Sequence, residues 1–236
     1  MAKAARKAER REDALSRERI VEAAITLLDE EGETGLTFRA LATRLSTGPG
    51  AIYWHIDNKS ELLLAASNAV VSRAIGEAAT ASPSPPPTSP RDAIHKIAVG
   101  VFEALDDHPW LGAQLSRAPW ETATLQIFER LGQQIQALGV SSRAHFTAVS
   151  TLSSYILGVS IQNGALRRAF NPADHGFEGP VDRAAVLASQ AARWSALDVQ
   201  EYPFTRTVAP QLRDHDDLAE FLAGVDLILT GITAGS

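Results

Sequence analysis

Three side chains between positions 37 and 59 carry groups that suit phosphate oxygens. Thr37 and Tyr53 carry hydroxyl groups, and Lys59 carries a cation where a helix is expected to begin. Hydroxyl groups, cations and helix N-termini commonly hold a nucleic-acid backbone, because they offer hydrogen-bond donors to anionic oxygens. This stretch is therefore the first candidate for a nucleic-acid-binding site.

The distribution of charge favours a nucleic-acid partner at one end of the chain. The 236 residues carry 22 basic and 28 acidic side chains, a net charge of −6. Residues 1–11 nevertheless hold five basic residues against one acidic residue, whereas residues 62–236 hold 12 basic and 17 acidic residues. Since a local patch attracts DNA more than net charge does, the basic segment from Lys3 to Arg11 predicts contact with phosphates or a minor groove. A solvated, disordered tail is the alternative.

Composition limits the other classes of protein. The chain has no cysteine, which excludes disulfides and thiolate metal sites. No apolar run approaches the ~18 residues that span a bilayer, and the first residues lack the apolar part of a signal peptide. We therefore expect a soluble, cytoplasmic protein without a cofactor, a metal or a membrane partner.

The elements that position the candidate residues are all expected to be helices. Apolar residues at positions 20, 23, 24, 27 and 28 recur at helical spacing, with Ser16 as the cap and Gly32 as the stop. Thr37 can cap a second, short helix, and Ser46-Thr47-Gly48 forms a tight turn. Pro49 then suits the first position of a third helix that ends near residue 55. Asn58, with an acidic residue three positions on, caps a fourth helix.

The remaining sequence predicts longer helices after a proline-rich spacer. Residues 81–90 contain five prolines and predict an extended segment, with Asp92 capping the helix that follows. Loops with proline and glycine are expected at residues 170–181 and 200–213. The expected helices cover approximately residues 91–107, 109–116, 120–138, 141–169, 182–199 and 214–233.

Two motifs in this region resemble the TetR family of transcriptional regulators. They are Leu36-Thr-Phe-Arg-Ala-Leu-Ala-Thr-Arg-Leu and Gly48-Pro-Gly-Ala-Ile-Tyr-Trp-His-Ile-Asp-Asn-Lys, and the strong match covers approximately residues 16–65. The resemblance implies an all-α fold with a basic arm (1–15), a three-helix helix-turn-helix head (16–62) and a ligand-binding and dimerisation domain of bundled helices (63–236). It also implies a repressor that binds a palindromic double-stranded DNA operator as a homodimer and responds to a small-molecule effector.

The resemblance assigns roles to individual residues of the head. It implies that Thr37, Tyr53, His55 and Lys59 hold the DNA backbone and that Arg39 reaches a base edge. Trp54 can pack against sugar and phosphate. Each role has a plainer alternative: a helix cap for the threonine, core packing for the two larger aromatic residues, a structural imidazole, and a solvated lysine.

The expected reading helix lacks the side chains that usually discriminate bases. Gly48, Pro49, Gly50 and Ala51 offer no arginine, asparagine or glutamine, so the family's operator cannot be transferred. Base discrimination would rest on the arginine of the preceding helix, on Thr47, on close backbone approach at the glycines and on contact with thymine methyl groups. DNA shape would add to it.

Two helices of the body are apolar on more than one side, which predicts a neighbour for each side. The resemblance implies that they pair across a two-fold axis as a four-helix bundle, and a core within one chain is the alternative. The candidate interface residues are Leu152, Ile156, Val159, Phe221, Val225 and Leu229.

Aromatic residues with a few polar neighbours predict a pocket for an apolar or aromatic ligand. Each single aromatic residue can instead be an ordinary core residue. The candidate ligand-binding residues are Phe102, Trp110, Gln114, Phe128, His145, Tyr155 and Trp194. The fourth helix, which runs to about residue 79, is the continuous link through which a ligand in the body would move the head.

Two other classes of protein fit the sequence less well. A helical enzyme is disfavoured because the sequence contains no Gly-x-Ser-x-Gly, P-loop, Gly-x-Gly-x-x-Gly or His-Glu-x-x-His motif. A helical adaptor that binds protein instead of DNA is disfavoured by the basic segment and by the Tyr-Trp-His motif.

Overall fold

The computed structural model describes residues 15–80, 89–117, 120–169 and 183–234. Within these ranges every regular element is a helix and none is a strand, as the sequence predicts. The helices are α2 (Arg17–Gly35), α3 (Phe38–Arg44), α4 (Pro49–Tyr53), α5 (Lys59–Thr80), α6 (Pro90–Asp107), α7 (Leu111–Arg117), α8 (Thr122–Ala137), α9 (His145–Ala169), α11 (Arg183–Ser195), α12 (Pro203–Val208) and α13 (Asp217–Ala234), with the 3-10 turns η1 (Ser142–Ala144) and η2 (Ala209–Asp214).

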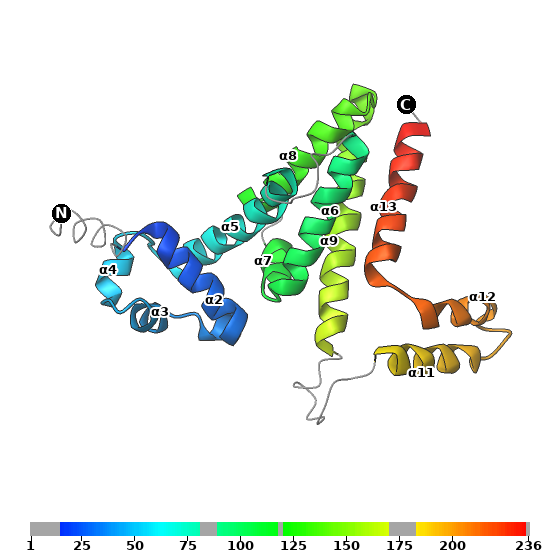
Figure 1. The fold of residues 1–236 in the computed structure, drawn as a ribbon, viewed down its shortest axis with the longest axis horizontal. Helices are drawn as coiled ribbons and strands as arrows, with labels where there is room; N and C mark the ends of the chain where they lie inside the picture. Colours follow the sequence, from blue (N-terminus) through cyan, green and yellow to red (C-terminus); the bar gives the residue numbers. More distant parts are fainter. Residues whose placement is uncertain (1–14, 81–88, 118–119, 170–182, 235–236) are drawn as a thin grey trace, which may run out of the picture.

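Figure 1 shows how these helices are arranged in space. The head, formed by α2, α3 and α4, lies at one end, and α5 leads from it into the body. The body consists of α5 to α9 and α13, with α9 packed between α6, α8 and α13. Residues 183–214, which we call the projection, extend from the body on the side of α13 (Figure 1).

The helices of the head begin at the residues that the sequence predicts. Side-chain oxygens of Ser16, Thr37 and Asn58 each accept a hydrogen bond from the backbone N–H three residues on, at 3.3, 3.1 and 2.9 Å. These bonds satisfy backbone donors that have no partner within the helix. Pro49 occupies the first turn of α4. Gly32 has φ +68°, a left-handed conformation that interrupts α2 near its end.

Two predictions about the body helices are wrong. Ser89, not Asp92, caps α6, because the Ser89 hydroxyl oxygen accepts the Asp92 backbone N–H at 3.2 Å. The expected loop at 200–213 contains α12 and η2. Its prolines, Pro203 and Pro210, lie in the first turns of these two elements, where a missing N–H does no harm.

One hydrophobic core joins the head to the body. It runs from Leu28 and Ile52 in the head, through Leu62 and Val70 on α5, to the residues that α9 and α13 bury. A continuous core fixes the orientation of the head relative to α5. Helices α5 and α6 approach each other closely, since a Cβ on Gly100 would lie 2.4 Å from the Ala74 carbonyl oxygen.

The candidate dimer residues lie largely inside the single chain. Leu152, Ile156, Phe221, Val225 and Leu229 are at most 1% exposed, and Val159 is partly buried. A side chain without accessible surface in one chain has none left to bury in a dimer. The prediction that these five residues form a dimer interface is therefore wrong. They are core residues of the single chain, which was the alternative. A bundle of α9 and α13 across a two-fold axis would have to use their outward faces.

Helix α9 also bears on the question of a membrane segment. Residues Ser142–Leu166 are long and apolar enough to cross a bilayer, by length and composition alone, contrary to the sequence-based expectation. The same helix packs against α6, α8 and α13. This is the packing of a core helix, which also passes such a test.

Candidate nucleic-acid interface and head–body cleft

The reading edge of the head is formed by α3, the turn after it and α4. Leu41 and Ile52 are fully buried and hold the two helices on the rest of the head. Ile56, just after α4, is also buried, whereas Tyr53 and Trp54, which precede it, are exposed. Phe38 and Tyr53 stack with ring centroids 4.4 Å apart, which fixes the direction of the tyrosine.

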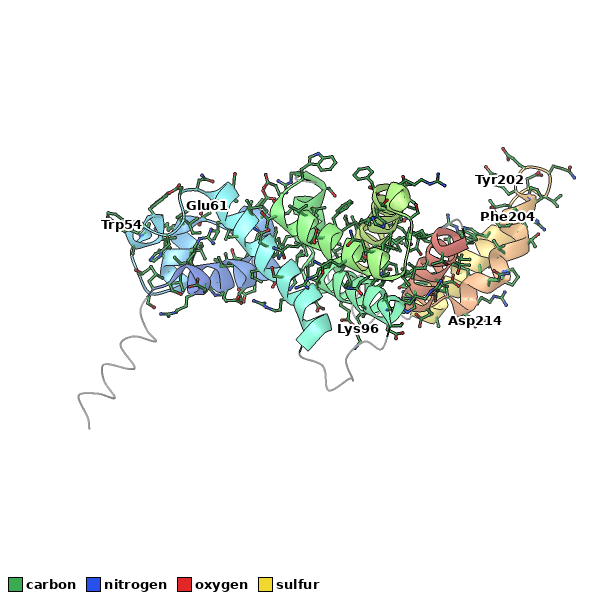
Figure 2. The ribbon with its side chains drawn as sticks, turned by 90° about the horizontal axis from the view of Figure 1, so that it is seen from above. Trp54, Glu61, Lys96, Tyr202, Phe204 and Asp214 are labelled. Carbon is green, nitrogen blue, oxygen red and sulfur yellow. The ribbon has the colours of Figure 1, made fainter. Side chains whose placement is uncertain are left out.

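The most exposed aromatic side chain of the head is Trp54. It is 89% exposed, and Figure 2 shows it at the end of the molecule that the head occupies. Tyr53 is 53% exposed, so its stacked ring still presents an edge to solvent. The core-packing alternative is therefore excluded for Trp54 and applies only in part to Tyr53.

The two arginines of α3 differ in their partners. Arg44 forms two hydrogen bonds with the Glu30 carboxylate, at 2.6 and 2.8 Å. Arg39 is exposed, and its guanidinium has no hydrogen bond or ion pair with any residue that the structure describes. Of the two, only Arg39 has its donors available for a base edge.

The other predicted DNA-binding residues surround this edge. Thr37 is exposed although its hydroxyl oxygen caps α3, so its O–H remains available as a donor. The Lys59 ammonium donates a hydrogen bond to the Glu33 carbonyl oxygen at 2.5 Å and thereby joins α5 to the end of α2. Gly48, Pro49 and Gly50 are exposed, and Thr47, Ala51 and His55 are partly buried. The basic segment Lys3–Arg11 lies outside the described residues.

A set of polar contacts, which we call the α2–α7 clamp, ties the head to the body. Asp29 Oδ1 accepts from Trp110 Nε1 at 2.7 Å and lies 2.8 Å from His108 Nδ1. One turn further on, Glu33 pairs with Arg117 and accepts from Gln114 Nε2 at 3.0 Å.

The Arg117 guanidinium beside Glu33 holds the pKa of this carboxyl below its usual value. Sequence reasoning missed Asp29, Glu33 and Arg117, since an acidic residue near the end of an exposed helix carries no local signal of a partner in another domain.

A cleft of about 460 Å³ adjoins the clamp. Its apolar surface comes from Leu63, Leu64 and Leu115, and its polar surface includes Glu33, Gln114 and Arg117. The cleft therefore lies between the head and the body, and two residues of the clamp that come from α7 form part of its wall.

The predicted ligand-binding residues have different contacts among the described residues. Trp110 and Gln114 belong to the clamp, whereas Phe102 and Tyr155 both stack on Phe221, at 5.0 and 5.9 Å between ring centroids. Burial raises the pKa of the Tyr155 hydroxyl, which donates to the Phe221 carbonyl oxygen at 3.1 Å.

The other three lie elsewhere. His145 Nε2 lies 2.7 Å from the Val140 carbonyl oxygen, and Phe128 packs against the exposed Phe146. Trp194 lies on α11, in the projection. A single pocket around these aromatic residues stays a prediction.

Buried polar atoms mark the interior of the body. Asn68 Oδ1, Thr124 Oγ1 and Ser153 Oγ have no hydrogen-bond partner among the described residues. They lie on α5, α8 and α9, where α8 packs against both of the other helices. Among the described residues no group of three or more His, Cys, Asp or Glu side chains could hold a metal ion.

Comparisons with known proteins cover both parts of the chain. Residues 20–66 match the family model of bacterial regulatory proteins of the tetR family, and residues 82–235 match that of the tetracyclin repressor-like C-terminal domain. A curated HTH-type transcriptional regulator of Saccharopolyspora erythraea is 32% identical over 145 residues, which span 61% of this chain and 59% of that relative.

Solved structures extend the similarity to most of the chain. A TetR transcriptional regulator of Streptomyces coelicolor is 50% identical, with a TM-score of 0.80, and the match covers 94% of this chain and 99% of that one. The structure of BioQ with its double-stranded DNA operator is 30% identical, with a TM-score of 0.53, and covers 66% of this chain and 91% of that one. The chain therefore belongs to the tetR family of bacterial regulatory proteins, and it is a helix-turn-helix transcriptional regulator, not an enzyme.

Proposed function

We propose that the protein is a cytoplasmic, homodimeric repressor whose two heads bind a palindromic operator and which an apolar or aromatic small molecule releases. The observation that carries the proposal is the reading edge, where Trp54 and Arg39 face solvent on a head with a well-packed core. An exposed aromatic group beside an available guanidinium suits a partner that offers sugar, phosphate and base edges. A relative, BioQ, has been solved with duplex DNA, which supports the same class of partner.

Each residue of the edge has a distinct part in this proposal. Helix α4 enters the major groove, Arg39 donates to a guanine, and Trp54 covers sugar and phosphate. The groups that hold the backbone or approach the bases are Thr37, Thr47, Gly48, Pro49, Gly50, Ala51, Tyr53, His55 and Lys59. In the dimer the two heads lie about 34–36 Å apart, which is one turn of DNA.

Two equally exposed tryptophans allow a matched test of the reading edge. Trp54 is 89% exposed in the head, and Trp120 is 88% exposed in the body. Replacing Trp54 with alanine should weaken binding to operator DNA at least about tenfold, because a tryptophan that becomes buried at the centre of an interface is commonly worth about 2 kcal/mol or more. Trp120→Ala should leave the binding constant unchanged. Equal effects of the two substitutions, measured by fluorescence anisotropy, would refute the assignment of the edge.

We infer that the effector binds in the head–body cleft. A volume of about 460 Å³ lies within the roughly 300–1,000 Å³ of small-molecule sites. The leucines favour an apolar or aromatic body for the ligand, and Gln114 and Arg117 favour a hydrogen-bond acceptor at one edge. Of the other predicted ligand residues, Trp110 lies nearest in sequence to this wall. Phe102, Phe128, His145 and Tyr155 belong to other parts of the body, and Trp194 belongs to the projection. A role for these five residues requires a ligand that extends beyond the cleft.

The clamp supplies a mechanism for release. A ligand that bonds to Gln114 or Arg117 competes with Glu33 for the same donors and frees the end of α2. The head can then tilt with α5. A hundredfold preference of the ligand for the form that does not bind DNA gives about 2.7 kcal/mol of coupling. By linkage, operator DNA must weaken the ligand by the same factor.

Titration of a panel of planar aromatic compounds, with and without operator DNA, tests this mechanism. Compounds that bind should do so more weakly when operator is present. The Arg117→Lys variant should lose most of this difference, because a lysine cannot form the paired contacts of the guanidinium. Equal affinity with and without DNA would exclude the mechanism, and tighter binding with DNA would make the protein a co-repressed regulator.

A further inference from the structure

Two aromatic rings join the short helices of the reading edge. Phe38 is the first residue of α3, and Tyr53 is the last residue of α4. Their ring centroids lie 4.4 Å apart and the ring planes meet at 6°, so the rings lie face to face. A stacked pair of this kind is favourable beyond the apolar area that it buries. The stack therefore ties the end of α4 to the beginning of α3.

The two rings have different surroundings. Phe38 is partly buried and packs against the hydrophobic core. Tyr53 is 53% exposed and is not among the described residues that pack on that core. The Tyr53 hydroxyl group has no hydrogen bond with any residue that the structure describes. The phenol is therefore held through its ring, on Phe38, and its hydroxyl group stays available to a partner.

The turn between α3 and α4 needs support from contacts of this kind. Ser46 has φ +52°, the left-handed region in which a helix commonly ends on glycine. Its N–H donates to the Thr43 carbonyl oxygen at 3.2 Å, and the next N–H donates to the Ala42 carbonyl oxygen at 2.9 Å. Because a side chain makes this backbone conformation unfavourable, contacts between the flanking helices must help to hold it. The stack of Phe38 on Tyr53 is one of these contacts.

We propose that Phe38 is a positioning residue for DNA binding, which through the stack holds the Tyr53 hydroxyl group where it meets a phosphate of the operator. An exposed tyrosine without such a neighbour samples several rotamers, and ordering it on binding costs free energy. The stack orders the ring before DNA arrives. The inference rests on the DNA-binding head of the proposed function, in which Tyr53 holds the backbone, and adds the residue that orients it.

A scan with methylphosphonates tests this role at the level of single phosphates. In the duplex that selection from a random library yields, each phosphate in turn is replaced by a methylphosphonate, which lacks one anionic oxygen. Where a phosphate accepts from Tyr53, the replacement should weaken binding about tenfold, because hydrogen bonds to charged groups are strong. Tyr53→Phe keeps the ring and lacks the hydroxyl group, so this position should become as insensitive as a phosphate without protein contact.

The variants at position 38 should show that the same contact depends on the stack. Phe38→Leu keeps an apolar side chain on the core but offers no flat face, so sensitivity should be lost at the same phosphate although Tyr53 is intact. Phe38→Met is a second variant without a ring and should behave alike. Phe38→Tyr keeps a ring and should retain the sensitivity. Circular dichroism establishes that each variant keeps its helices.

Affinities for the unmodified duplex give a second readout. Tyr53→Phe and Phe38→Leu should each weaken binding about tenfold, and the double variant should be no weaker than either, because both remove the same contact. Phe146→Leu is the matched control. It removes a ring that packs on Phe128 in the body, at 6.1 Å between ring centroids, and should leave the affinity unchanged.

The outcomes separate the positioning role from DNA binding itself. If the double variant binds about a hundredfold more weakly than the wild-type protein, the two side chains act independently and the proposal is overturned. Retained sensitivity at the Tyr53 phosphate in Phe38→Leu and Phe38→Met overturns it as well, while the DNA-binding head stands. A wild-type protein that binds no duplex refutes the DNA-binding head and the positioning role with it.

Discussion

Arg39 and Arg44 lie on the same short helix, yet their surroundings give them different roles. Arg44 forms an ion pair with Glu30 within the head, whereas Arg39 has no partner among the described residues. The same contrast separates Arg39 from Lys59, whose ammonium group already bonds to the Glu33 carbonyl oxygen. At the scale of the residue, the partners that a side chain has in the free protein decide whether it can read bases or only hold the backbone.

Alanine substitutions should separate these two roles. Arg39→Ala should relax the preference at one base pair of each half-site, at about 1–3 kcal/mol. Lys59→Ala should weaken binding to all sequences alike and lower the salt slope by about one unit. Binding-site selection with both variants provides the measurement. Indistinguishable specificity profiles would show that the division between reading and anchoring is wrong.

The Glu33 carboxylate predicts a pH dependence of the clamp. Because Arg117 holds its pKa below the usual value of about 4.3, Glu33 stabilises the folded protein above that pH. This contribution is lost as the pH falls through the lowered pKa. At neutral pH the Glu33→Gln variant should therefore have a lower free energy of unfolding than the wild-type protein. In acid this difference should vanish. Glu103→Gln, which removes an exposed carboxylate of α6, is the control. A Glu33→Gln effect that does not change with pH contradicts the pairing.

The sequence predicted the helix caps and the exposed reading edge but not the clamp. Ser16, Thr37 and Asn58 act on backbone groups three residues away, so their roles can be recognised locally. Trp110 and Asp29 are 81 positions apart, and only the tertiary fold brings them together.

At the scale of the elements, hydrophobic periodicity predicts where the long helices lie but not which of their faces the chain itself buries. Helices α9 and α13 each have more than one apolar side, and the sequence could not say which side the chain itself buries. Phe221 and Val225 were assigned to a dimer, whereas the structure buries them against the chain's own helices. Helix α11 of the projection was predicted, but α12 and η2 were missed because Pro203 and Pro210 suggest a loop, although proline also begins helices.

Two glycines test the packing of these helices. A Cβ on Gly100 would lie 2.4 Å from the Ala74 carbonyl oxygen, so Gly100→Ala should push α6 from α5 and destabilise the protein by about 1–3 kcal/mol. A Cβ on Gly132 would meet only a methyl group of Val149 at 3.8 Å. Gly132→Ala should instead stabilise by about 0.5–1 kcal/mol, since alanine favours the helix. Denaturant unfolding measures both, and a neutral Gly100→Ala would contradict the close approach of α5 and α6.

At the scale of the whole molecule, exposed aromatic residues lie at both of its ends. Trp54 lies on the head, and Tyr202 and Phe204 lie on the projection (Figure 2). In the proposed dimer the outward faces of α9 and α13 lie near the two-fold axis and the heads lie far from it, where they can reach successive turns of the major groove. The head–body cleft lies between these two ends, so a ligand there can change the separation of the heads without breaking the dimer.

Selection of duplexes from a random library, followed by measurement of the best duplex at several salt concentrations, tests the central claim most directly. The proposed function predicts a palindromic site with half-sites about 34–36 Å apart and two chains on each duplex. It also predicts an affinity that falls steeply as salt rises, because several phosphate contacts release counterions. No enrichment of any sequence, an unsymmetrical site bound by one chain, or an affinity that is indifferent to salt would contradict a dimeric DNA-binding repressor.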